Sequence, residues 1–339
     1  MTRWMVLPTA LLLLVLMVAG CGGGGSSSSG GATAASPSGN VSYISPVGSQ
    51  PSQQILFNGF EKAAKEVGWS ANQLDSALSP DKQVSNIETA VNQNAAAITS
   101  WTLDPNAAAG GYETAQNSGI PVVGINSVGP GLSGTVWWEI EQCEPGGPQQ
   151  ESAEAMAKMH PGAKIILIGF EGAESTRRYE ECFQKEAEKA GLDIINKTNN
   201  EADNAAGSQK VFEPLLTKYP EVEAVWCYND ESALGVSAAL LAGGKEIATT
   251  ENPQGVIVTG QNGDAGAIEA VEQGRMTWTW DPDNFATGFA AVQMMDEAVE
   301  GHNSKELVVL AEKFSLENIA EYVPPEEREY TLQDYPLKK

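Results

Sequence analysis

The stretch Glu223-Ala224-Val225-Trp226-Cys227-Tyr228-Asn229-Asp230-Glu231-Ser232-Ala233-Leu234-Gly235 decides the fold. Its apolar first part, residues 222–227, is short and rich in buried residue types, so it predicts a strand. A helix is predicted directly after it. Asn229 and Asp230 stand between the two, where a strand ends and a helix begins, and both are residues that cap helices.

The same order of strand and helix recurs along the chain. Helical spacing of Phe60, Ala63, Ala64 and Val67 predicts a helix over 55–67, and another is predicted over 176–190. Strand-like runs cover 41–45, 95–99, 119–125, 164–168 and 255–259. This alternation predicts an α/β fold of parallel sheets with helices on both faces. A chain of 339 residues is long enough for two such domains.

Polar and aromatic residues gather where these strands end. In parallel sheets, ligands bind beyond the carboxyl ends of the strands. Those positions are rich in Asn, Asp, Arg and Trp, and they lie within 46–53, 101–105, 126–127, 171–178, 229–230, 262–264 and 280–283. Amides can bond hydroxyl groups and flat rings can cover C–H faces, so a hydroxylated small ligand is predicted.

The composition and the absence of certain motifs argue against several other classes of protein. Forty-four acidic against 20 basic residues give a formal net charge of -24, which argues against nucleic-acid binding. His160 and His302 are isolated, and there is no HExxH or CxxC pattern, so no zinc site is expected. The sequence has neither a GxSxG elbow nor a Walker loop. We therefore expect neither an enzyme nor a cofactor.

The N-terminal segment predicts export. Residues 1–20 have a basic start and a short apolar core, as signal peptides do. The run Val18-Ala19-Gly20-Cys21 is similar to a bacterial lipobox, in which Cys21 receives the lipid; the alternative is an ordinary signal peptide with a chance cysteine. Residues 21–40 are rich in Gly and Ser and predict a flexible tether. We expect a protein anchored by lipid to the outer face of the bacterial cytoplasmic membrane, or a periplasmic one.

From residue 41 to about 322, the chain resembles the ribose-binding protein family of type 1, sugar-binding periplasmic binding proteins. The resemblance rests on the opening stretch and on three further pieces, in order: Asp104-Pro105-Asn106, Gly119-Ile120-Pro121-Val122-Val123 and Val258-Thr259-Gly260-Gln261-Asn262-Gly263. It implies two Rossmann-like lobes with parallel sheets, joined by a three-crossing hinge near Ile140, Trp280 and Leu310. The N-terminal lobe would comprise 41–140 plus 281–310, and the C-terminal lobe 141–280 plus 311–330.

The resemblance also implies a set of ligand contacts. Arg177 and Asn229 match the family's residue types, whereas Asn126 and Asn262 stand where the family has aspartates. Trp280 replaces a glutamine at the later crossing. Gln50 and Gln53, with Ser52, stand in a first-lobe cluster that lacks the usual aromatic rings. The predicted ligand-binding residues are Arg177, Asn229, Asn262, Asn126, Trp280, Gln50 and Gln53.

Each of the main candidates has an alternative structural role. Arg177 could be an exposed helix charge. Asn229 could simply cap the helix that follows it. Trp280 could fill space left by smaller neighbours.

The three cysteines after Cys21 leave two possibilities open. Export permits disulfides, and within the implied second lobe the helices near Cys143 and Cys182 would be neighbours. A bridge between these two would leave Cys227 free, in a buried strand. The other possibility is three reduced thiols.

Together these features predict an extracytoplasmic substrate-binding lipoprotein of an ABC importer. It would bind a sugar or similar small polar molecule between two lobes and pass it to the permease subunits of the transporter. The alternative is a sensor lipoprotein that presents the ligand to a membrane receptor, using the same fold and cleft.

Overall fold

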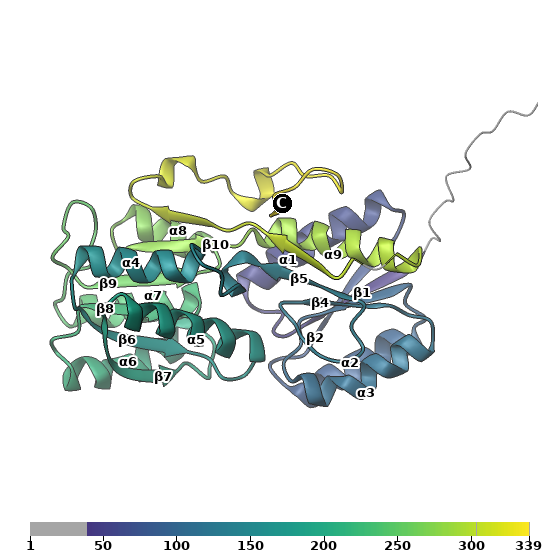
Figure 1. Ribbon diagram of the computed structural model, residues 1–339, viewed down its shortest axis with the longest axis horizontal. Coiled ribbons are helices and arrows are strands. Elements are labelled where there is room, and N and C mark those ends of the chain that lie inside the picture. The colour runs from purple at the N-terminus through teal and green to yellow at the C-terminus, as the bar shows by residue number, and fades with distance from the viewer. Residues whose placement is uncertain (1–38, 303, 339) are drawn as a thin grey trace, which may run out of the picture. The chain divides into compact units, whose positions relative to one another are not determined.

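Two six-stranded sheets organise the chain in the computed structural model (Figure 1). The structure describes residues 39–302 and 304–338, which belong to one compact unit. The predicted signal peptide, the lipid site Cys21 and nearly all of the tether lie outside the described residues. The sheets confirm the predicted α/β class.

The first sheet has the order β11-β5-β4-β3-β1-β2, and all of its neighbouring strands are parallel. Its strands are β1 (Asn40–Ser45), β2 (Ser70–Asp75), β3 (Ala97–Ser100), β4 (Val122–Ile125), β5 (Gly134–Trp138) and β11 (Glu306–Val309). Its helices are α1 (Pro51–Glu66), α2 (Pro80–Asn92), α3 (Pro105–Asn117) and α9 (Asn284–Val299).

The second sheet has the order β12-β10-β9-β8-β6-β7, with β12 antiparallel to β10 and the other pairs parallel. Its strands are β6 (Lys164–Gly169), β7 (Asp193–Asn199), β8 (Ala224–Cys227), β9 (Ile257–Gln261), β10 (Trp278–Asp281) and β12 (Glu312–Ser315). Its helices are α4 (Pro148–Met159), α5 (Glu174–Lys189), α6 (Ala205–Lys218), α7 (Asp230–Ala242) and α8 (Ala265–Glu272).

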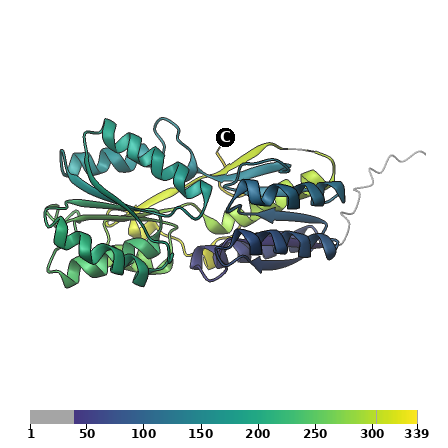
Figure 2. The ribbon, with the colours of Figure 1, turned by 90° about the horizontal axis from the view of Figure 1, so that it is seen from below.

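Helices cover both faces of each sheet, as Figure 2 shows. On the first sheet, α1 packs against α9 and α2 against α3; on the second, α4 packs against α5 and α6 against α7. The α1–α9 contact depends on glycine. A Cβ on Gly59 would lie 2.1 Å from the carbonyl oxygen of Phe285, and one on Gly288 would lie 2.2 Å from the amide nitrogen of Phe60. Only hydrogen at these positions lets the two backbones approach so closely.

Within the described residues, three connections lead from one sheet to the other. The first follows β5 and contains a short 3₁₀ helix, η1 (Glu139–Glu141). The second is the short link of residues 282–283 between β10 and α9, and the third is the pair 310–311 between β11 and β12. They lie near Ile140, Trp280 and Leu310.

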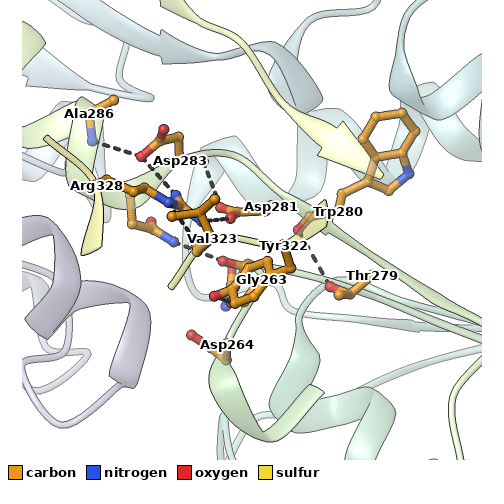
Figure 3. A network of polar contacts seen from close by, with 12 residues as sticks. Gly263, Asp264, Thr279, Trp280, Asp281, Asp283, Ala286, Tyr322, Val323 and Arg328 are labelled. Carbon is orange, nitrogen blue, oxygen red and sulfur yellow. Dashed lines mark hydrogen bonds and ion pairs between the residues drawn. The ribbon is translucent and has the colours of Figure 1, made fainter. Parts of the chain in front are cut away.

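Each sheet with its helices forms one lobe, and the lobe of the first sheet is the first lobe. The C-terminal segment, residues 316–338, links the two lobes once more. Tyr322 donates to the carbonyl of Gly263 in the second lobe, with an O–O distance of 3.1 Å. Arg328 pairs with Asp281 and Asp283 beside the second connection (Figure 3). Lys338 then donates its backbone N–H to Val308 of the first sheet at 2.9 Å. The expected division placed residues 311–330 in the second lobe alone.

Among the described residues, no helix combines the length and apolar character needed to cross a bilayer.

Candidate ligand-binding cavity between the lobes

A small cavity lies between the ends of the two sheets. Its volume is about 60 Å³, measured as the space open to the centre of a water molecule. One water molecule needs roughly 10–15 Å³ on this measure. Its lining follows the carboxyl ends of β1, β2, β3, β5, β6, β7, β8 and β9. The lining residues are Pro46, Val47, Gln50, Ser52, Gln53, Leu78, Trp101, Leu103, Trp138, Glu141, Phe170, Ala173, Thr176, Tyr179, Asp203, Tyr228, Asn229 and Asn262.

Aromatic rings from both lobes form the apolar walls. Trp101, just after β3, meets Trp138, at the end of β5, edge to face with ring centroids 4.7 Å apart. From the second lobe, Phe170 and Tyr228 stack with centroids 5.4 Å apart. Such flat surfaces can pack against the C–H faces of a sugar ring or attract a cationic group.

Asp203 and Asn229 form a polar corner of the cavity. The Nδ2 of Asn229 donates to Oδ1 of Asp203 at 2.9 Å, and the hydroxyl of Tyr228 donates to the same oxygen. Asn229 also caps α7, since its Oδ1 accepts from the backbone N–H of Ser232 at 2.9 Å. Burial raises the pKa of Asp203 to about 6, although these hydrogen bonds act in the opposite direction.

Glu141 is the least satisfied group of the cavity. It is 1% exposed, and neither carboxylate oxygen has a hydrogen-bond partner among the described residues. Burial raises the pKa of its carboxyl to about 8, and the positive charge of Arg178 lowers it only in part. Because a buried polar group without a partner is costly, this side chain is suited to receive donors from a ligand.

Two hydrogen bonds beside the cavity join the first lobe to the second. The indole Nε1 of Trp101 donates to Oγ of Ser175 in α5, at 3.0 Å. At the N-terminus of α1, Nε2 of Gln50 donates to the carbonyl oxygen of Asp203, at 2.8 Å. The structure is therefore a closed arrangement of the two lobes.

Four of the predicted ligand residues line the cavity: Gln50, Gln53, Asn229 and Asn262. Three do not. Arg177 is exposed and donates through Nη1 to the carbonyl of Glu171, at 2.5 Å. Asn126 is buried, and its Oδ1 accepts from the backbone N–H of Trp138 at 2.8 Å. Trp280 lies in β10 and donates to Oγ of Ser152 at 2.8 Å, so its ring packs inside the second lobe.

Glu141 and Asp203 were not among the site residues predicted from the sequence, for two different reasons. Asp203 follows β7, whose residues Asp193–Asn199 are too polar to be recognised as a buried strand. Glu141 lies on the first connection rather than at a strand end. A charged residue at the expected crossing near Ile140 was the one signal that could have found it.

The structure contains a disulfide between Cys143 and Cys182, whose Cα atoms lie 5.6 Å apart. Cys143 belongs to the connection after η1, and Cys182 to α5. The bond therefore ties this connection to the helix that carries Ser175. Of the described cysteines, Cys227 is free, and it is buried in β8.

A cavity formed where the strand ends of two α/β lobes meet is typical of a class of proteins that close around a small solute. The chain belongs to the periplasmic binding protein family: the family model described as periplasmic binding protein domain matches residues 41–303. This confirms the family predicted from the sequence. The family binds solutes outside the cytoplasm, and the chain is a binding protein rather than an enzyme.

The chain is similar to a relative that is named for an import function and to solved structures of solute-binding proteins. The ribose import binding protein of Bacillus subtilis is 28% identical over 247 residues, which cover 73% of this chain and 77% of the relative. Two solved structures share the fold. A solute-binding protein of an ABC transporter from Bacillus halodurans, with bound myo-inositol, is 22% identical with a TM-score of 0.73, covering 86% of this chain and 99% of that chain. One from Burkholderia graminis, in complex with D-arabinose, is 19% identical with a TM-score of 0.74 and the same coverage.

Proposed function

We propose that this protein is the lipid-anchored, substrate-binding component of an ABC importer and that it captures a sugar or similar small polyhydroxylated molecule. The observation that carries this proposal is the cavity between the lobes, which combines aromatic walls with buried polar groups. Rings such as Trp101 and Tyr228 suit the C–H faces of the solute, and Asn229 and Gln53 suit its hydroxyls. The ligands named for the relatives, ribose, myo-inositol and D-arabinose, are of this chemical class.

The way the lobes meet supports capture by closure. Gln50 and Trp101 of the first lobe hydrogen-bond to the second lobe beside the cavity. A ligand that contacts both lobes would favour this closed arrangement over an open one, because it gains contacts only when the lobes meet. Delivery to permease subunits and the lipid anchor at Cys21 are part of the same proposal. The anchor rests on the sequence Val18-Ala19-Gly20-Cys21 alone.

A thermal-shift screen of the mature chain against pentoses, hexoses, amino sugars and cyclitols tests the proposal. A ligand that binds the folded state raises the melting temperature by mass action, by an amount that grows with its concentration over Kd. Titration calorimetry of each compound that shifts the melting temperature should then give one site per chain. If no compound of these classes shifts the melting temperature at millimolar concentration, the proposed function is wrong.

A further inference from the structure

When Glu141 is ionised, the polar atoms of the cavity lining that lack a partner are all acceptors. On the described residues that line the cavity, the buried side-chain atoms without a partner are Oε1 of Gln50 and both carboxylate oxygens of Glu141. A ligand that fills the cavity must therefore bring donors to these atoms. Hydroxyl groups and ammonium groups both donate, but an ammonium offers three donors and accepts nothing.

The charge of the cavity separates these two kinds of donor. Glu141 and Asp203 are acidic, and none of the described residues lining the cavity is Lys, Arg or His. Neutral hydroxyls would satisfy the hydrogen bonds of Glu141 but would bring no opposite charge, so its carboxyl would stay protonated in this buried, largely apolar site. A cation would supply both the donors and the charge.

The groups around Glu141 do not already supply that cation. Arg178 of α5 is the positive side chain that acts on Glu141, but it forms no ion pair with it, and its guanidinium lies 4.9 Å from the ring centroid of Trp137. Tyr179 also lies near Glu141, but it donates its hydroxyl to the carbonyl of Tyr228. Both oxygens of Glu141 are therefore left without a partner among the described residues.

The aromatic walls favour the same kind of ligand. A cation within about 6 Å of a ring centroid is attracted by the ring face, most strongly by Trp. Trp101, Trp138, Phe170 and Tyr228 surround the cavity from both lobes. The formal charge of -24 on the whole chain adds a long-range attraction for cations.

We infer that the cavity selects a polyhydroxylated amine in its ammonium form, such as an amino sugar or an amino-cyclitol, and that Glu141 receives the ammonium group. The inference rests on the proposed function, since it names the class of solute bound at the same site. Asp203 and the amides of Asn229 and Gln53 would then take the hydroxyls, and the rings would cover the C–H faces.

Matched ligands test the inference on the mature chain. Titration calorimetry at pH 6.5 compares three sets: D-glucosamine, D-glucose and N-acetyl-D-glucosamine; the corresponding galactose compounds; and an amino-deoxy-inositol with myo-inositol. We expect the amine in at least one set to bind tenfold or more tightly than its neutral counterparts. In Glu141→Gln, that amine should lose tenfold to a hundredfold in affinity, while the neutral counterparts change by less than about threefold.

Two further variants separate charge at the site from charge in general. Glu171→Gln removes one acidic group that is exposed and does not line the cavity, so amine binding should stay within about twofold of the parent. Asp203→Asn removes the second carboxylate and should weaken the amine less than Glu141→Gln does, since Asp203 already has partners on Tyr228 and Asn229.

The outcomes distinguish the two proposals. If a neutral member binds as tightly as its amine, or if Glu141→Gln leaves the preference unchanged, the inference is wrong and the proposed function stands. If no compound of any set binds the parent chain at millimolar concentration, the inference is wrong, and the proposed function fails with it only if the pentoses of the thermal-shift screen do not bind either. Circular dichroism and melting curves of each variant establish that it is folded.

Discussion

Arg328 and Asp281, 47 residues apart in the chain, form a buried ion pair with an Nη2–Oδ2 distance of 2.5 Å. Nη1 of the same guanidinium lies 3.0 Å from Oδ1 of Asp283 (Figure 3). Asp281 ends β10 and Asp283 lies in the connection between β10 and α9, whereas Arg328 comes from the C-terminal segment. The pair therefore fixes this segment over a link between the lobes.

Removal of this guanidinium should destabilise the fold. In Arg328→Met, Asp281 and Asp283 lose their opposite charge while their side chains stay about nine-tenths buried. Breaking such a buried pair costs about 3–5 kcal/mol in the free energy of unfolding. Urea unfolding followed by circular dichroism measures the loss. In the control Lys65→Met, which removes an exposed partner of Glu61, the free energy should change by less than about 0.5 kcal/mol. Equal losses in the two variants would contradict the role given to Arg328.

Glu141 should make the stability depend on pH. Its folded pKa of about 8 lies above the usual 4.5, so between these values the folded state binds a proton that the unfolded state has released. This contribution is fully present below about pH 4.5 and is lost as the pH rises toward 8. Glu141→Gln removes it. Each unit of pKa difference corresponds to about 1.4 kcal/mol. Between pH 5 and 8, the free energy of unfolding should therefore fall by at least about 2 kcal/mol more in the parent than in the variant. Parallel pH profiles of the two proteins would contradict the raised pKa.

Asn229 and Arg177 should differ in their effect on ligand binding, although the family resemblance implies both as contacts. Asn229→Ala removes the bond to Asp203 and the cap of α7, so affinity should fall about tenfold and stability by about 1 kcal/mol. Arg177→Ala should bind within about twofold of the parent, since its side chain is exposed and directed to Glu171. Calorimetric titration with the ligand from the screen compares them. A larger loss for Arg177→Ala would restore it as a ligand contact.

The disulfide should be present in exported protein. Non-reducing peptide mapping is expected to link Cys143 to Cys182 and to find Cys227 as a thiol, since burial in β8 also raises the pKa of Cys227 well above its usual value. Loss of the bond in Cys143→Ser should cost about 2–4 kcal/mol. A linked peptide that contains Cys227, or three free thiols, would refute this pairing.

Lipidation of Cys21 should determine where the protein is found in the cell. The Cys21→Ser variant should move from the membrane to the soluble fraction, because acyl chains contribute about 0.8 kcal/mol per buried CH₂ to membrane binding. Fractionation and immunoblotting of cells that express parent and variant measure the change. Membrane association that persists in the variant would show that another feature holds the protein there.

The sequence predicted the fold well where local patterns were strong. Apolar strands such as Ala224–Cys227, each followed by a helix, are visible without any structure because both periodicities are local. Asn229 could be placed in the site for the same reason, since it stands directly after such a strand. The polar strands Ser70–Asp75 and Asp193–Asn199 lacked that pattern, and the site residues that follow them were missed with them.

By itself, the sequence determined the α/β class, the family and the strand ends at which a ligand would bind, because these depend on residue patterns a few positions long. Tertiary structure alone decided which of those residues face the cavity. Trp101 meets Trp138 there, Glu141 is buried there without a partner, and Arg177 turns outward. The physical reason is that sheet order and the paths of the connections bring together residues far apart in the chain, and burial then sets their charge and their need for partners.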